Sequence, residues 1–332
     1  MVNMRAPFEI EEITPAAPGR YDGFLAASPQ GTVFAGPSWL SLLAGRLPGR
    51  VFALAFAAGG ETKAVVPVWE RREALLGAVA ELPPLTPYWG PCLPPPGDLR
   101  PERARARDHD VLAAVAAEFK RRWRYCRLAC HPALADVRPF TWAGFRGEGR
   151  YTAVLAPAAE DEFLASLSSS LRNKIKQGEG RPVEESADAE PFVAMYAATF
   201  GRRGMTPPVP EGFVRALAAA FCPAAGSIFY VRGDGGEPVA GRLVLWGGGT
   251  AYELLAASFD EGRGPLGAYL MWRVIRAVWE RGLALDMVGV NVASIARFKE
   301  SFGGALTPYY QLAAYRSPLV RLWAGARRRL SG

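Results

Sequence analysis

Apolar residues at helical spacing mark the most regular helix of the chain. Residues 160–177 begin with three acidic residues and are followed by Gly178, and both features are typical of helix termini. The apolar positions between them recur every four residues, as on one buried helix face. These positions are Phe163, Leu167, Leu171 and Ile175. The pattern therefore predicts one continuous helix over residues 160–177.

Two apolar segments with glycine turns resemble each other in the two halves of the chain. Residues 59–69 read GGETKAVVPVW and residues 235–246 read GGEPVAGRLVLW, and each follows an apolar run. Apolar strands around a glycine turn predict a β-hairpin at each place. A repeated unit favours two domains of one fold, and the alternative is chance similarity of two hairpins. We place the domains at residues 1–150 and 151–332.

The second half of the chain alternates helices and strands. From Phe192 onward the order is helix, hairpin, strand, glycine-rich turn, helix, strand and helix. A strand that follows another strand through a helix requires some parallel pairing. The predicted class is therefore α/β, with a mixed twisted sheet flanked by helices in each domain.

A lysine falls on the apolar face of a short helix near the end of this half. The apolar run 283–290 ends at Asn291, which is a good helix N-cap, and the pair Gly303-Gly304 ends the helix. One face of this helix carries Ile295, Phe298, Lys299 and Phe302. Burial of an ammonium group is costly unless a partner compensates it. We therefore expect either a partner or substrate at Lys299, or a packed stem whose charged head reaches water.

Composition indicates an ordinary globular protein. Half of the 332 residues are apolar, which suits about two domains with large cores. No stretch of 18 residues is continuously apolar, so no membrane span is expected. Glu9, Glu11 and Glu12 stand where a signal peptide needs an apolar core. We expect a cytoplasmic protein, either free or peripheral at the inner face of the membrane.

Net charge and the few cysteines and histidines limit the kinds of ligand and catalytic site that are expected. The net charge of +7 suits a phosphate-bearing partner, but an arginine-rich solvated surface would show the same charge. The four cysteines are too scattered for a disulfide framework, and the C-x-x-x-C spacing of Cys126 and Cys130 does not fit a zinc site. Since the chain has only two histidines, a histidine-based triad is not expected. We therefore expect no metal.

Three segments carry groups suited to phosphate. Arg172 and Lys176 lie near the end of the helix over 160–177, where they could hold a phosphate or simply complement the helix dipole. Residues 262–268 form a glycine-rich entry to a helix, which offers backbone N–H groups to a pyrophosphate. The basic segment 319–330 either docks on its own domain or contacts membrane or RNA.

Three motifs and the duplicated architecture resemble one family. The segments FKESFGG, SLRNKIKQG and PVAGRL resemble FemABX aminoacyltransferases and the related double-GNAT proteins, over about Gly31 to Tyr315. The resemblance implies two tandem GNAT-like (acyl-CoA N-acyltransferase-like) domains. It also implies transfer of an aminoacyl group from aminoacyl-tRNA to an amine of a peptidoglycan or other cell-envelope precursor, linked to a nucleotide or a lipid. No resident cofactor is then required, because aminoacyl-tRNA is a co-substrate.

The resemblance also suggests roles for individual residues. Phe298 and Lys299 match a motif whose lysine is associated with transition-state stabilisation, and Arg172 matches an arginine associated with the diphosphate of the precursor. We add four candidate substrate contacts, namely Lys176, Tyr252, Asp286 and Asn291. Asp286 could support the charge of Lys299 or cap its strand, and Tyr252 could touch substrate or belong to the core. The segment between Phe200 and Ile228 leaves no room for the long helical arm of some members.

Two other functions remain open. An acyl-CoA-dependent GNAT N-acyltransferase would act on an envelope sugar or a small amine, and Gly264 and Gly267 would then contact the cofactor. The GNAT loop usually reads R/Q-x-x-G-x-G/A, and Leu266 stands at the first glycine position here. The third reading is a non-catalytic protein that binds tRNA or an envelope precursor on a GNAT scaffold.

Overall fold

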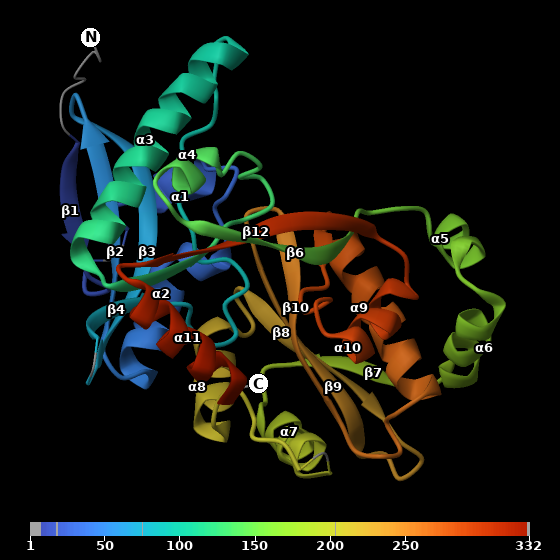
Figure 1. Ribbon diagram of the computed structural model, residues 1–332. Helices are drawn as coiled ribbons and strands as arrows, with labels where there is room; N and C mark the ends of the chain where they lie inside the picture. Colours follow the sequence, from blue (N-terminus) through green and yellow to red (C-terminus); the bar gives the residue numbers. More distant parts are fainter. Residues whose placement is uncertain (1–7, 18, 75, 203, 331–332) are drawn as a thin grey trace. The chain divides into compact units, whose positions relative to one another are not determined.

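The computed structural model describes residues 8–17, 19–74, 76–202 and 204–330, which fall into two compact units (Figure 1). The first unit contains the described residues up to Arg150 and those from Pro308 onward, and the second is Tyr151–Thr307. The chain leaves the first unit within strand β6 (Arg146–Leu155) and returns to it within β12 (Ala305–Tyr315).

The first unit is built on a mixed sheet with the strand order β1-β2-β3-β4-β5-β12. Strands β4 and β5 pair in parallel, and the other described pairs are antiparallel. Besides β12, the strands are β1 (Glu9–Ile13), β2 (Arg50–Ala58), β3 (Glu61–Glu73), β4 (Gly77–Glu81) and β5 (Tyr125–Ala129). The helices are α1 (Asp22–Ala27), α2 (Pro37–Arg46), α3 (Pro101–Arg122), α4 (Arg138–Trp142) and α11 (Pro318–Leu330), with a 3-10 turn at Val33–Ala35.

The last segment of the chain packs into the first unit. Strand β12 pairs with β5 from Gln311 to Tyr315, and Val320 and Ala324 of α11 join a small core with Val79. The expected second domain, 151–332, therefore differs from the second compact unit at its C-terminal end. The reason is long-range strand pairing, which local periodicity does not reveal. Helix α11 docks on its own unit through these two side chains.

The second unit follows the order β6-β11-β10-β9-β8-β7. Its other strands are β7 (Val183–Ser186), β8 (Gly226–Arg232), β9 (Pro238–Gly247), β10 (Thr250–Ser258) and β11 (Ala284–Asp286). Its helices are α5 (Glu160–Ser166), α6 (Ser169–Gly178), α7 (Glu190–Arg202), α8 (Glu211–Phe221), α9 (Pro265–Glu280) and α10 (Ala293–Glu300). Strands β10 and β11 pair in parallel through the crossover helix α9, as expected. The predicted α/β class is confirmed.

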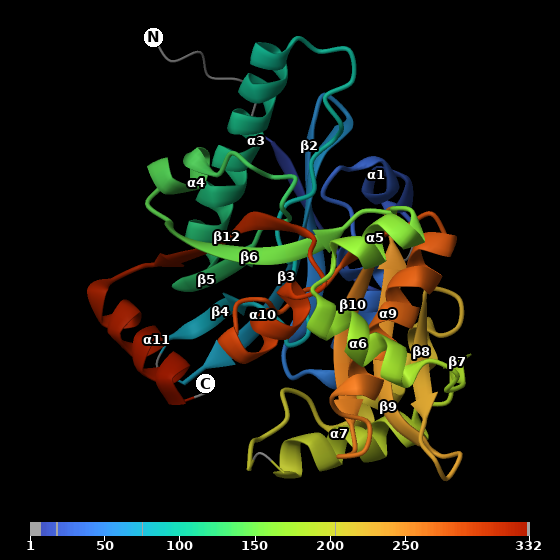
Figure 2. The same ribbon diagram turned by 90° about the vertical axis from the view of Figure 1, so that its right-hand side faces the viewer.

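Helices cover both faces of this sheet. Helices α6 and α9 lie side by side on one face, as Figures 1 and 2 show, and a Cβ atom on Gly178 of α6 would lie 2.4 Å from the side chain of Tyr269 in α9. On the other face, Phe192 of α7 packs over Gly241 of β9. Since successive strand residues point to opposite faces, Arg242 is directed towards the α9 side.

The helix expected over 160–177 is divided in two. Helix α5 ends at Ser166 and α6 begins at Ser169, and the hydroxyl of Ser168 accepts a hydrogen bond from the backbone N–H of Leu171 at 3.2 Å. The expectation of one continuous helix was wrong, because Ser168 is an N-cap in a segment whose apolar spacing continues across the break. The four apolar side chains are nevertheless buried, as expected.

Both expected hairpins are present. Strands β2 and β3 pair antiparallel, as do β8 and β9. Gly59 and Gly60 have φ values of +61° and +77°, which side chains with a Cβ atom rarely adopt, so the first turn requires glycine. The described residues between α7 and β8 contain the 11-residue helix α8 and no long helical arm. Among the residues that the structure describes, no helix is both long and apolar enough to span a membrane.

Candidate functional site

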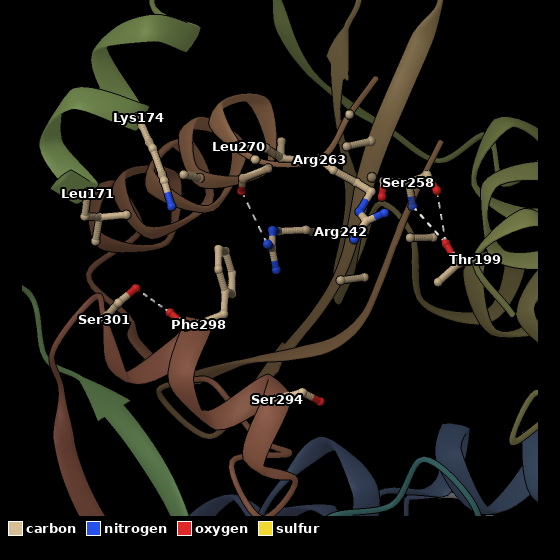
Figure 3. Close-up of a pocket in the computed structure, with 18 of the residues that line it drawn as sticks. Leu171, Lys174, Thr199, Arg242, Ser258, Arg263, Leu270, Ser294, Phe298 and Ser301 are labelled. Atoms are coloured by element: carbon tan, nitrogen blue, oxygen red, sulfur yellow. Dashed lines mark hydrogen bonds between the residues drawn. The ribbon is translucent and has the colours of Figure 1, made fainter. Parts of the chain in front are cut away.

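The second unit contains a cavity of about 740 Å³ beside β9, β10 and the start of α9 (Figure 3). Its walls come from β9 and β10, the loop before α9 and the first turns of that helix, and helices α6, α7 and α10. A volume of this size suits a small molecule or the end of a larger one. The polar and charged lining residues are Lys174, Thr199, Arg242, Ser258, Arg263, Ser294, Arg297 and Ser301.

The glycine-rich entry to α9 forms one wall. Gly264 and Gly267, the two expected cofactor contacts, both line the cavity. Gly264 has a φ of +67° and directly precedes α9, and a Cβ atom on Gly262 would lie 2.2 Å from the carbonyl oxygen of Val239. These glycines therefore allow a backbone approach that other residues would block. Pro265 occupies the first helical position and supplies no N–H group.

Positive charge dominates the lining. Lys174, Arg242, Arg263 and Arg297 face the cavity, and no carboxylate is among its described lining residues. Arg263 lies 3.6 Å from Asp260, and both side chains are largely exposed. Figure 3 shows Lys174 extending from α6 towards the space beside Phe298. A cavity with cations and no anion in its walls is suited to a ligand with negative charge.

Lys299 is buried directly behind this wall, with a side chain 10% exposed. Its Nζ atom donates to the carbonyl oxygens of Met287 at 2.6 Å and Val288 at 2.8 Å, and it lies 2.7 Å from Oε2 of Glu253. Three protein oxygen atoms thus surround the ammonium group. The lysine therefore has the expected partner and its head does not reach water. Lys299 is not among the residues that line the cavity.

Glu253 is the carboxylate that supports this charge. It is 1% exposed and lies between Lys299 and Arg242, with which it also forms an ion pair. Burial raises the pKa of Glu253, but the two cations together lower it more, so the pKa lies below the ordinary value of 4.5. Glu253 is thus held as a carboxylate. Asp286 accepts from the backbone N–H of Val288 at 2.9 Å and from the hydroxyl of Thr152, which is the capping alternative of the two roles expected for it.

Arg242 connects the buried charges to the cavity. Its guanidinium group contacts Glu253, lies 3.4 Å from the carbonyl oxygen of Gly267, and is 5.2 Å from the ring centroid of Phe298. Its Nε atom is buried and has no acceptor among the residues that the structure describes. Figure 3 shows the guanidinium group beside the Phe298 ring at the cavity. Arg242 is the buried cation with donors left for a ligand.

A β-bulge brings Glu253 to the face on which Arg242 lies. In the β9–β10 pair, Glu253 is opposite Val244 and Ala256 is opposite Arg242, with a register shift between Glu253 and Leu255. Glu253 and Ala256 are three residues apart and would point to opposite faces of a regular strand. The extra residue in β10 places both on one face, so Glu253 can reach Arg242.

Two expected substrate contacts, Asn291 and Tyr252, have structural roles, and one residue expected to be buried is exposed. The amide of Asn291 bonds to both the N–H and the carbonyl of Tyr151, and Val292 rather than Asn291 precedes α10, so the expected N-cap was wrong. Tyr252 is 1% exposed in β10 and belongs to the core. Ile295, expected on the buried face of α10, lies in its first turn and is 37% exposed, so burial is confined to the later turn.

The basic residue of α6 that lines the cavity is not one of the two that were expected to bind a phosphate. Arg172 is exposed and donates to the carbonyl oxygens of Ala165 at 2.9 Å and Leu164 at 3.4 Å, which places it at the end of α5. Lys176 is exposed and, like Arg172, is absent from the described cavity lining. Lys174, between them, faces the cavity. Their expected contact with a diphosphate stays a prediction.

Several residues of the site had no role predicted from the sequence. These are Lys174, Arg242, Glu253, Arg263 and Arg297. One signal was present, because Arg242 and Glu253 are the charged residues inside two otherwise apolar strands of one sheet. Among the described residues, no cluster of three or more His, Cys, Asp or Glu side chains could hold a metal ion.

Comparisons with known proteins agree with this fold. Residues 165–300 match the family described as the acetyltransferase (GNAT) domain. The crystal structure of FemX is similar to this chain with a TM-score of 0.69 at 15% identity, over 95% of this chain and 99% of FemX. L-PGS from Bacillus licheniformis is similar with a TM-score of 0.54 at 15% identity, over 95% of this chain and 97% of L-PGS. A comparison with curated protein sequences found no match.

These findings define the class of protein. The chain has a FemABX-like double-GNAT fold, as its motifs implied. The matched domain contains the cavity walls from α6, β9, β10, α9 and α10. The protein is an acyltransferase on a GNAT scaffold.

Proposed function

We propose that this acyltransferase moves an aminoacyl group from aminoacyl-tRNA to an amine of a peptidoglycan or other cell-envelope precursor. The observation that carries the proposal is the cavity with Lys174, Arg242, Arg263 and Arg297 and no carboxylate among its described lining residues. The end of a tRNA brings several phosphates, and cations on different elements can follow such a backbone. The similarity to FemX supports the same reaction class.

The ester of aminoacyl-tRNA is already activated, so the enzyme mainly has to align it with the acceptor amine. The amine nitrogen attacks the carbonyl carbon of the ester, a C–N bond forms, and the π electron pair moves onto the carbonyl oxygen. When this oxyanion collapses, the bond to the ribose oxygen breaks, and that oxygen gains the proton that the amine loses. A fixed cation near the oxyanion lowers the barrier. Alignment of the two substrates and a cation near the oxyanion are thus what this site would have to supply.

The entry to α9 favours tRNA over an acyl-CoA donor. A pyrophosphate at a helix terminus is held by consecutive N–H groups. Pro265 lacks one of these donors, and Leu266 stands where the GNAT loop usually has its first glycine. Acyl-CoA stays as the second candidate because Gly264 and Gly267 line the cavity at this helix terminus. It would acylate an envelope sugar or a small amine.

A transfer assay tests the proposal. The protein is incubated with total tRNA charged with labelled amino acids and with the UDP-linked muramyl-pentapeptide precursor, and label on the precursor is measured. Label that depends on charged tRNA is the expected result. A parallel reaction uses acyl-CoA thioesters with envelope amines. Transfer from acyl-CoA without transfer from tRNA would replace the first function by the second.

A matched pair of variants connects the activity to the cavity. Lys174→Gln removes a cavity cation, whereas Arg215→Gln removes a cation of α8 that pairs with Glu190 and does not line the cavity. We expect Lys174→Gln to raise the KM for the charged tRNA and Arg215→Gln to leave it unchanged. Equal effects of the two variants would argue against the cavity as the donor site.

A further inference from the structure

Three buried side chains of the second unit carry a net positive charge. Glu253 is the single carboxylate in contact with Arg242 and Lys299 among the described ion pairs, so the group has a charge of +1. The three residues are 1%, 6% and 8% exposed, respectively. A buried charge without a counter-charge is costly. The free protein therefore holds a positive charge that an anionic group of a substrate would compensate.

This charge faces the cavity through Arg242 rather than through Lys299. Nζ of Lys299 is surrounded by oxygen atoms of Met287, Val288 and Glu253 and does not line the cavity. A guanidinium group has five donors. Arg242 uses one on Glu253, has a long contact of 3.4 Å to the carbonyl oxygen of Gly267, and its buried Nε has no acceptor among the described residues.

Depth separates Arg242 from the other cations of the cavity. Arg242 is buried, whereas Lys174, Arg263 and Arg297 are exposed. A donor that enters with its acyl group first would leave its phosphates at the exposed cations and bring its carbonyl group to the depth of Arg242. Figure 3 shows Arg242 between the Phe298 ring and the start of α9. The buried position also excludes water, which strengthens the interaction of the guanidinium group with an anion.

We propose that Arg242 donates hydrogen bonds to the carbonyl oxygen that becomes negative during acyl transfer, and that Glu253 and Lys299 are positioning residues. The inference rests on the proposed function. As the C–N bond forms, the π electron pair moves onto the oxygen beside Arg242, and Arg242 transfers no proton. On collapse the leaving oxygen departs with its electron pair and takes the proton that the amine loses.

The positioning role follows from the geometry of the three groups. Lys299 is anchored by two backbone carbonyl groups of the segment after β11, and it holds one oxygen of Glu253. The other oxygen of Glu253 holds Nη1 of Arg242. The orientation of the guanidinium group is thereby set from its buried side, and the remaining donors are left for the substrate.

The test is a steady-state comparison of five variants in the transfer assay. Arg242→Met removes the cation. Arg242→Lys keeps the positive charge but lacks the planar guanidinium group with its several donors. Lys299→Met removes the ammonium group that holds Glu253. The double variant carries Arg242→Met and Lys299→Met. The control is Arg232→Gln in β8, because Arg232 pairs with Glu184 and does not line the cavity. Thermal unfolding of each variant confirms that it is folded.

We expect Arg242→Met to lower kcat by about 10²–10³-fold with little change in the KM of the acceptor amine. Arg242→Lys should recover part of that loss, and the control should keep wild-type kcat. Because Lys299 acts through Arg242, the double variant should be no slower than Arg242→Met. A wild-type kcat for folded Arg242→Met would overturn the proposal, as would a double variant that loses the product of the two single effects.

The identity of the acyl donor shows whether a failed test contradicts the role of Arg242 or the proposed function. Transfer from acyl-CoA alone would overturn the proposed function, while the same five variants would still decide the role of Arg242, since both donors form an oxyanion. Transfer from aminoacyl-tRNA with unimpaired Arg242→Met would support the function and overturn the inference. A folded wild-type protein that uses neither donor would overturn both.

Discussion

Nζ of Lys299 lies 2.7 Å from Oε2 of Glu253, and both side chains are buried. Arg242 contacts the same carboxylate, so one buried anion forms ion pairs with two cations. Glu253 is therefore the member of the group whose loss leaves two uncompensated positive charges in the interior. Loss of either cation leaves a neutral pair instead.

Glu253→Gln should accordingly be the most destabilising single change at this site. Removal of one partner from a buried ion pair costs about 3–5 kcal/mol. The free energy of unfolding, measured by urea denaturation, should fall by an amount in this range. Arg242→Met should lose less, because Glu253 keeps Lys299 as its partner.

Glu184→Gln is the matched control for this change. Glu184 also pairs with an arginine, Arg232, but its side chain is 41% exposed. Exposed pairs contribute about 0–1 kcal/mol, so the control should change stability little. A loss for Glu253→Gln no larger than that for Glu184→Gln would contradict the central place of Glu253.

The lowered pKa of Glu253 predicts a loss of stability in acid. In the folded protein the pKa of this carboxyl lies below the ordinary value of 4.5, so the folded state favours the charged form. The stabilisation is complete above that value and is lost as the pH falls from about 4.5 through the folded pKa. Unfolding free energies measured at successively lower pH should show this decrease.

Arg242→Met provides the comparison for the acid effect. It removes one of the two cations that lower the pKa of Glu253, so the decrease in stability below the ordinary pKa of 4.5 should be smaller than in the wild type. An identical decrease in both proteins would assign the acid sensitivity to other carboxyl groups.

How far the sequence predicts this site depends on the range of each contact. Helical spacing placed Lys299 on the apolar face of its helix, because residues three and four apart share a face, but it left open whether the charged head is buried. Its partner Glu253 lies on strand β10, whose bulge places Glu253 on the same face as Arg242, and residue spacing does not reveal this bulge. The resemblance assigned the cation role to Lys299, and side-chain geometry was needed to single out Arg242.

The limits of prediction for the fold have the same origin. The two hairpins and the crossover helix α9 depend on local patterns, and the structure contains them. The break at Ser168 was missed because a capping serine does not interrupt an apolar stripe. The return of β12 to β5 was missed because strand pairing over a long stretch of chain leaves no local signal.

The close contact of α6 and α9 predicts an intolerance at Gly178. A Cβ atom there would lie 2.4 Å from Cβ of Tyr269, so alanine would force the helices apart. Such overpacking typically costs about 1–3 kcal/mol. Because Lys174 lies on α6, Gly178→Ala should also raise the KM for the donor.

Gly212→Ala is the control for Gly178→Ala. Gly212 is also helical, in α8, but a Cβ atom there would meet nothing within 4 Å. Alanine is favoured over glycine in helices by up to about 1 kcal/mol, so Gly212→Ala should be neutral or stabilising in thermal unfolding. Destabilisation by both changes to the same degree would show that the α6–α9 contact is not the cause.

Salt dependence offers the last prediction, on the binding of charged tRNA. If Lys174 contacts a phosphate at the cavity, the binding constant should fall as salt rises, and Lys174→Gln should reduce the slope of log K against log[salt] by about 1. Fluorescence titration with charged tRNA at several salt concentrations measures both slopes. Arg215→Gln, which removes an equal charge from α8 outside the cavity, should keep the wild-type slope. If Lys174→Gln has the same slope of log K against log[salt] as the wild type, the phosphates do not contact Lys174. If Lys174→Gln and Arg215→Gln reduce the slope equally, the cause is the net charge of the protein rather than a contact at the cavity.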